Sequence, residues 1–117
     1  MTKIIVVYNS YLAQLLGLDG LVLYPFILIS TTMKDTLPST LKHEMTHVKQ
    51  INRDGWCRFY CQYCIYTCRD CYANNKYERE AYAAENMALT PAELEILNLP
   101  PTFPKTDKEM ILINTNK

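Results

Sequence analysis

The chain has 117 residues, of which 49% are hydrophobic, and this fits a single domain with a small core. Its 12 basic and 12 acidic residues cancel, which argues against nucleic acid as the main partner, because phosphate-binding proteins carry a basic surface. The N-terminus shows no signal-peptide cleavage site, and polar residues and Pro25 interrupt the most apolar region, residues 12–29, so no membrane span is expected. Five cysteines without a secretion signal indicate reduced thiols and a cytoplasmic location.

The N-terminal part of the chain predicts a small β element. Residues 3–8 form a short segment rich in β-branched side chains, which is typical of a strand. Residues 11–20 predict one or two helical turns that end at a glycine. Residues 21–30 predict extended chain, with residues 27–29 as the core of a strand. Because Pro25 has no amide hydrogen to donate, it suits an edge strand or a bulge.

A long helix is predicted from Pro38 to Asp54, with Thr36 or Ser39 as its N-cap and Gly55 at its end. The apolar residues that recur there at helical spacing are Leu41, Met45, Val48 and Ile51 or Asn52.

Helices are also predicted at about residues 56–72 and 77–89. Another begins after Thr90, where Pro91 and Glu93 complete the signal of a capping box. The tail after residue 99 carries three of the six prolines and is expected to be extended, with its "MILI" stretch packing as a strand or an arm.

Both histidines of the chain lie in the segment "KHEMTH". His43 and His47 are four residues apart, so they project side by side from a helix and can bind one Zn²⁺. Glu44 is rotated away from that face, but it can reach a water in the open position of the metal and act as a general base. The alternative is a pair of surface histidines on an amphipathic helix.

A catalytic zinc ion needs a third protein ligand, and no other histidine is present. The ligand must therefore be a carboxylate or a thiolate. The stretch "NNKYEREAYAAEN" offers three glutamates on one predicted helix: Glu78, Glu80 and Glu85.

"HEMTH" followed by "EREA" resembles the gluzincin metallopeptidases, in which a second helix supplies a glutamate from a Glu-x-x-Ala motif. The resemblance covers about residues 36–88 and implies that Glu78 is the third ligand and that Ala81 lets the two helices approach closely. Glu80 points away from this face and is expected to be solvated. In size the chain is similar to the minigluzincins and to small phage-encoded zinc peptidases.

The sequence departs from the family pattern at Tyr82, where these peptidases usually have an aspartate. That position would orient His43 through its second ring nitrogen, and Glu85 is a possible substitute. The resemblance also implies that an edge strand at residues 26–30 pairs with the substrate, although a plain core strand is equally compatible. The candidates for stabilising the oxyanion are Tyr72, Tyr77 and Tyr82.

The five cysteines form a stripe on the helix predicted at residues 56–72. They are Cys57, Cys61, Cys64, Cys68 and Cys71. Their spacing places them on one face, with Phe59, Tyr63 and Tyr66 opposite. The stripe is interpreted as a close-packed core seam; a second metal site and redox or disulfide chemistry are the alternatives.

Together these patterns predict an α+β fold, in which a small β element is followed by a zinc-bearing helix and about three further helices. One minimal domain would have a β-containing part (1–35), a helical part with the zinc site (36–100) and an extended tail (101–117). The predicted function is that of a zinc metallopeptidase with one Zn²⁺ per chain, a peptide or protein as substrate, and no nucleic acid or membrane partner. The alternative is a non-catalytic zinc-binding module with a structural or interaction role. The sequence leaves the oligomeric state open.

Overall fold

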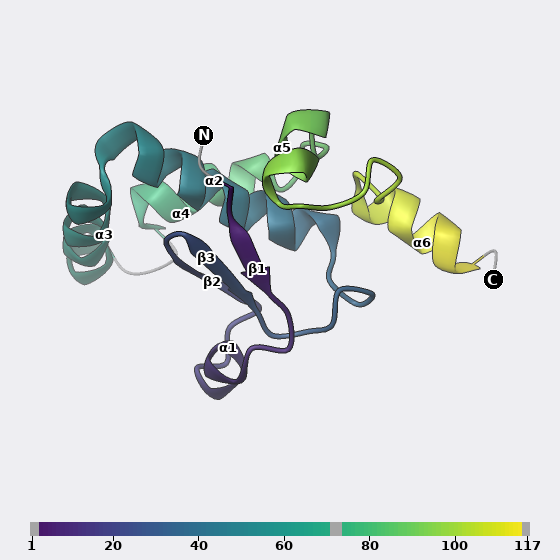
Figure 1. Ribbon diagram of the computed structural model, residues 1–117. Coiled ribbons are helices and arrows are strands. Elements are labelled where there is room, and N and C mark those ends of the chain that lie inside the picture. The colour runs from purple at the N-terminus through teal and green to yellow at the C-terminus, as the bar shows by residue number, and fades with distance from the viewer. Residues whose placement is uncertain (1–2, 71–73, 116–117) are drawn as a thin grey trace.

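The computed structural model describes residues 3–70 and 74–115. It confirms the α+β class, because a small three-stranded sheet is combined with a larger set of helices. The elements follow in the order β1 (Ile5–Val7), α1 (Tyr11–Leu15), β2 (Gly20–Leu23), β3 (Phe26–Ile29), α2 (Pro38–Asp54), α3 (Trp56–Asp70), α4 (Lys76–Ala84), α5 (Pro91–Ile96) and α6 (Asp107–Thr115). Figure 1 shows that α2 lies over one face of the sheet and that α6 projects away from the sheet near the C-terminus.

The sheet has β3 at its centre, paired in parallel with β1 and antiparallel with β2. β2 and β3 form a hairpin, and Pro25 lies in its turn. The expectation that Pro25 belongs to an edge strand or a bulge is therefore wrong. A turn is a favourable place for proline, because no ladder hydrogen bond is required of it there. On the face toward α2, the side chains of Val22, Ile27 and Ile29 are buried.

The helix that carries both histidines has the predicted limits, Pro38–Asp54, and Gly55 ends it with a φ of 85°. All the residues of its predicted apolar stripe except Asn52 are buried, so Ile51 is the fourth member. Each of these side chains contributes about 1.5–3 kcal/mol by leaving water. The stripe holds α2 against the sheet and thereby sets which face the histidines occupy.

The N-cap of α2 differs from the prediction. Its position is taken by Leu37, which has no side-chain cap, and the Thr36 hydroxyl donates to Thr32 O instead, at 2.6 Å. The amide and hydroxyl of Ser39 donate to the two carboxylate oxygens of Asp107, at 2.9 and 2.7 Å. A carboxylate from α6 therefore satisfies the first turn of α2.

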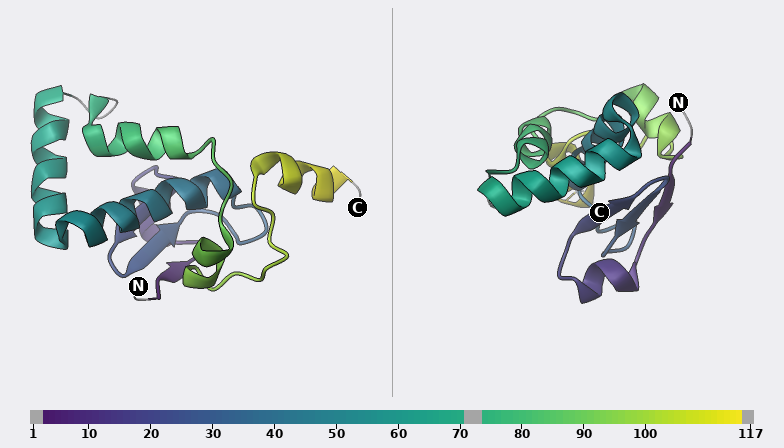
Figure 2. Two further views of the ribbon diagram at one scale, coloured as in Figure 1. Left: turned by 90° about the horizontal axis from the view of Figure 1, so that it is seen from above. Right: turned by 90° about the vertical axis from the view of Figure 1, so that its left-hand side faces the viewer.

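Helix α4 runs alongside α2, while α3 crosses the end of both (Figure 2). The side chain of Asn75 caps α4 by accepting from the amides of Tyr77 and Glu78, and its own amide donates to Tyr63 O. Ala81, one turn further along, is fully buried, which agrees with the close approach of helices expected at this alanine. The helix ends at Ala84, several residues before the predicted limit.

The expectation of an extended tail is wrong, because residues 107–115 form the helix α6. The sequence carries a signal for it that the "MILI" pattern obscured. Thr106 Oγ1 accepts from the Glu109 amide at 3.1 Å, as at the start of a capping box. Of the four apolar residues, Met110 is buried, and Ile111–Ile113 are exposed.

Helix α5 begins as predicted, with Thr90 and Glu93 forming a reciprocal capping box. The Glu93 carboxylate also accepts hydrogen bonds from Lys42 and Lys49 on α2, at 2.6 and 2.7 Å. Burial alone would raise the pKa of Glu93, but the two lysines and the Thr90 amide outweigh it and lower the pKa to about 2. This buried ion pair fastens α5 to the helix of the histidines.

Glu93→Gln is expected to lower the free energy of unfolding by about 3 kcal/mol at pH 7, because it leaves Lys42 without its buried partner. The pKa of Glu93 is depressed in the folded state, so its contribution is complete above the unfolded value near 4.5 and is lost as pH falls toward 2. Urea unfolding between pH 7 and 2 measures both effects. The exposed Glu95→Gln, on the same helix, is the matched control. An equal change in the two variants would contradict the prediction.

Candidate metal centre

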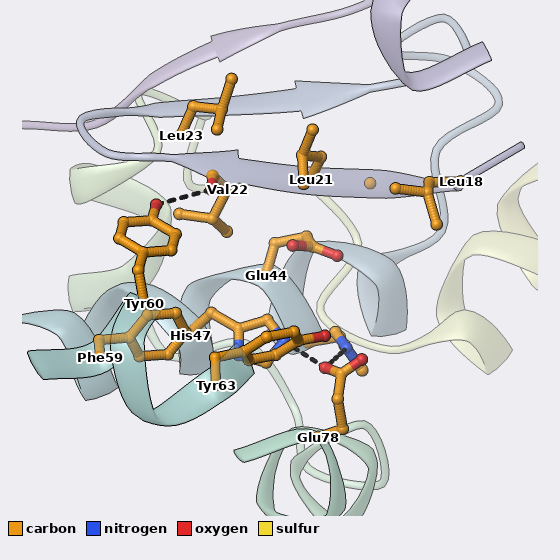
Figure 3. A pocket seen from close by; sticks show the side chains of 12 residues that line it. Leu18, Leu21, Val22, Leu23, Glu44, His47, Phe59, Tyr60, Tyr63 and Glu78 are labelled. Atoms are coloured by element: carbon orange, nitrogen blue, oxygen red, sulfur yellow. Dashed lines mark hydrogen bonds and ion pairs between the residues drawn. The ribbon is translucent and has the colours of Figure 1, made fainter. Parts of the chain in front are cut away.

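Two helices bring three potential metal ligands together beside the sheet (Figure 3). His43 and His47 come from α2 and Glu78 from the first turn of α4, and all three residues are buried. Glu78 Oε1 lies 3.1 Å from His43 Nε2 and 2.5 Å from His47 Nε2. Within the described residues, this is the group of three or more ligand-type side chains whose ligand atoms lie within 4.8 Å of one another. The predicted convergence of these residues is therefore present.

Gln50 fixes the orientation of the His47 ring. Its Nε2 donates to Tyr77 O and to Glu80 Oε1, both at 3.1 Å, so its Oε1 must face His47 Nδ1, which is 2.8 Å away. An amide oxygen only accepts, so Nδ1 carries the hydrogen. In the neutral ring, Nε2 then presents its lone pair toward Glu78.

The short distance between His47 and Glu78 requires a proton between them. A lone pair on Nε2 and a carboxylate oxygen repel each other at 2.5 Å unless the two atoms share a proton. Burial alone would lower the pKa of His47, but the hydrogen bond to Glu78, the charge of Glu44 and the hydrogen bond to Gln50 together raise it. Two imidazoles and one carboxylate are a donor set that suits Zn²⁺, so the residues present fit the metal.

The side chain of Glu44 projects from α2 toward the sheet and lies against Gly20, the first residue of β2. A Cβ at Gly20 would come within 2.8 Å of Glu44 Oε1, so only glycine leaves room for this carboxylate. Burial raises the pKa of Glu44 to about 7, against the lowering influence of His47 and His43. A carboxyl group with a pKa near neutrality can both take up and return a proton.

Beyond the other two ligands, the His43 ring has Glu85 and Tyr82 as neighbours. Its Nδ1 lies 3.7 Å from Glu85 Oε1, and its ring meets Tyr82 edge-on at a centroid distance of 4.8 Å. Glu85 is therefore close to the place proposed for it as a substitute, although the distance is longer than a direct hydrogen bond. Glu80 is about half exposed, in line with the expectation that it is solvated, but it also supports the metal group through Gln50.

Two cavities open on either side of His43 and Glu44. One, of about 210 Å³, lies between β2 and α3 and also reaches His47 and Glu78. The other, of about 270 Å³, is bordered by Asp19, Thr40, Tyr82 and Glu85. The three ligands therefore face open space rather than a closed core.

The strand beside the first cavity is not the predicted one. β3 (Phe26–Ile29) is the central strand of the sheet, so the alternative of a plain core strand is correct, and the edge strand next to the cavity is β2. The hydroxyl of Tyr60 donates to Val22 O at 2.8 Å and ties α3 to that edge. The hairpin at Pro25 explains the error, because it divides one apolar run into two strands.

The structure separates the candidate tyrosines. The hydroxyl of Tyr77 donates to Asp54 Oδ2 at 2.9 Å, which commits it away from the metal group, whereas Tyr82 stays beside His43. Tyr72 lies outside the described residues. Tyr63, which was not among the candidates for stabilising the oxyanion, lines the first cavity, and in Figure 3 its side chain extends from α3 toward Glu78.

The interpretation of the cysteine stripe as a core seam is wrong for its four described members, which are exposed free thiols: Cys57, Cys61, Cys64 and Cys68. Cys71 lies outside the described residues. The opposite face of α3, with Phe59 buried and Tyr63 and Tyr66 packed against the core, turns inward instead. Aromatic side chains bury more apolar area than thiols do, which decides the orientation of the helix. The metal and redox alternatives for the stripe stay predictions.

None of the helices in the described residues is long and apolar enough to cross a membrane. Comparison with family models, with curated proteins and with solved structures finds no match to this chain.

Proposed function

We propose that this chain is a zinc-dependent peptidase of gluzincin type, with one Zn²⁺ held by His43, His47 and Glu78. The observation that carries the proposal is the convergence of ligand atoms from His43, His47 and Glu78 to within 4.8 Å of one another beside an open cavity. This donor set supports a zinc ion at this point, and the cavity supports access for a substrate. Resemblance to the family motif supplies the reaction class.

In this proposal each residue around the zinc site has a separate role. A bound zinc ion would supply Lewis acidity, which polarises a carbonyl and makes water acidic near neutral pH. Glu44 takes a proton from the attacking water and returns it to the departing amine. Gln50 holds the imidazole of His47 in orientation through its hydrogen bond to Nδ1, and Glu85 is the acidic group nearest to Nδ1 of His43. Tyr63 and Tyr82, on opposite sides of the metal group, are the candidates for stabilising the oxyanion.

The edge strand β2 is the proposed support for the substrate backbone. It borders the cavity that also contains His43, Glu44 and His47. An extended peptide laid along such an edge gains main-chain hydrogen bonds without demanding one particular side chain. A peptide or protein is therefore the proposed substrate class. We also place the protein in the reducing cytoplasm, because its described cysteines are exposed free thiols.

The alternative, a non-catalytic zinc module, differs in what the metal does. A structural zinc site is closed by four protein ligands, whereas the group here has three members within the described residues and faces a cavity. This arrangement favours the enzyme.

Removing zinc with a chelator tests the proposal. Hydrolysis of an unstructured protein such as casein is expected to stop, and the melting temperature is expected to fall by about 10 °C, because tight binding stabilises the folded state. One equivalent of Zn²⁺ per chain should restore both hydrolysis and stability. A casein assay measures the first and thermal unfolding the second, while atomic absorption gives the zinc content. Restored stability without turnover would favour the structural module; a protein that takes up no zinc would refute both.

A further inference from the structure

The face of the sheet that points away from α2 is entirely apolar. Strand pairing sets two cross-strand rows on this face, and each row takes one residue from every strand. The rows are Ile5–Phe26–Leu23 and Val7–Leu28–Leu21. None of the six side chains is polar, and four of them are exposed in the chain as described, from 38% for Val7 to 53% for Ile5.

Helices α2 to α5, as far as the structure describes them, lie on the opposite side of the sheet (Figures 1 and 2). Among the helices that the structure describes, α1 lies on the side of this face, and it adds apolar surface instead of covering it. Its own exposed residues are Tyr11, Leu12, Leu15 and Leu16. Most of these ten large apolar side chains are about half exposed. Monomeric soluble proteins rarely leave a contiguous apolar patch of more than a few hundred Å² in water.

We propose that the outer face of the sheet is the interface of a homodimer, in which the sheets of two copies of this chain pack face to face. Two rows of aliphatic and aromatic side chains form a surface that is complementary to itself, as a two-fold interface requires. Stacked sheets pack about 10 Å apart with interdigitated side chains. The ten side chains offer on the order of the 800 Å² that each partner of a standard interface buries.

The absence of charge in the two rows argues against partners that bind through charge. A nucleic acid or an acidic protein would be met by basic residues, and the six strand residues include none. Glu44 and the histidines project from α2 on the other face of the sheet, so the interface would leave the metal group itself uncovered. Leu21 and Leu23 belong both to this face and to the lining of the first cavity. The dimer does not rest on the proposed peptidase activity, and its test does not measure turnover.

Sedimentation velocity at tens of micromolar tests the proposal. The unmodified protein is expected to sediment as two copies of the 13.6 kDa chain. Ile5→Lys, which introduces a charge on the strand farthest from β2, is expected to weaken the dimer at least about 100-fold and give monomers. Ile111→Lys, at a similarly exposed position on α6, is the matched control and should remain a dimer. Circular dichroism and metal content should be unchanged in both variants.

A monomeric unmodified protein at these concentrations would overturn the proposal, whatever else covers the face. So would an Ile5→Lys variant that stays dimeric while Ile111→Lys dissociates, since the interface would then involve α6. If Ile5→Lys fails to fold, Phe26→Lys provides the same charge on the neighbouring strand and decides the question.

Discussion

Replacing Glu44 by glutamine is expected to lower kcat for peptide hydrolysis by about 10³-fold while one zinc ion per chain is retained. Glutamine has the shape of glutamate and fits the space left by Gly20, so the helix and the ligands stay in place. It cannot accept a proton, so the step that activates water loses its base. Zinc content by atomic absorption and turnover of a fluorogenic peptide library measure the two quantities independently.

The control for this variant is Glu95→Gln, an exposed change of the same chemistry outside the cavities. It should match the unmodified protein in both measurements. Unchanged turnover in Glu44→Gln would mean that another group is the base, and loss of zinc would mean that Glu44 supports the metal directly.

The sequence predicted the helix of the histidines because every signal for it is local. The apolar stripe, Pro38 at its start and Gly55 at its end lie within 18 residues of one another. From the residues alone Glu78 was one of three candidate glutamates, and the resemblance to the Glu-x-x-Ala motif selected it. Local pattern therefore placed the two histidines, and the resemblance supplied the third candidate ligand.

Interactions between distant segments were the ones that the sequence did not reveal. The cap of α2 comes from Asp107, 68 residues after Ser39. The inward face of α3 could not be chosen from one stripe alone, because the cysteine stripe and the aromatic stripe are each compatible with a core. Gln50 was missed for another reason: it lies one turn after His47 and on the same face, but a glutamine becomes an orienting group only when Tyr77 O and Glu80 fix its amide.

Removing the third ligand should have the largest effect on metal binding. Glu78→Ala is expected to weaken zinc affinity by more than about 100-fold, because it deletes a ligand rather than one of its supports. Glu80→Ala, two residues away on the same helix, should change the affinity by about tenfold or less, since Glu80 acts only through Gln50. Competition with a chromophoric zinc chelator measures both affinities on one scale.

The comparison of these two variants separates a metal ligand from a buried ion pair. If Glu78 only neutralised protonated histidines, its loss would destabilise the fold at acidic pH and leave zinc binding by His43 and His47 little changed. If it is a ligand, affinity falls at every pH at which the imidazoles are neutral. Equal affinities for the Glu78→Ala and Glu80→Ala variants would show that the two helices do not share an ion. The carboxylate that lies 2.5 Å from His47 would then be held there by a proton alone.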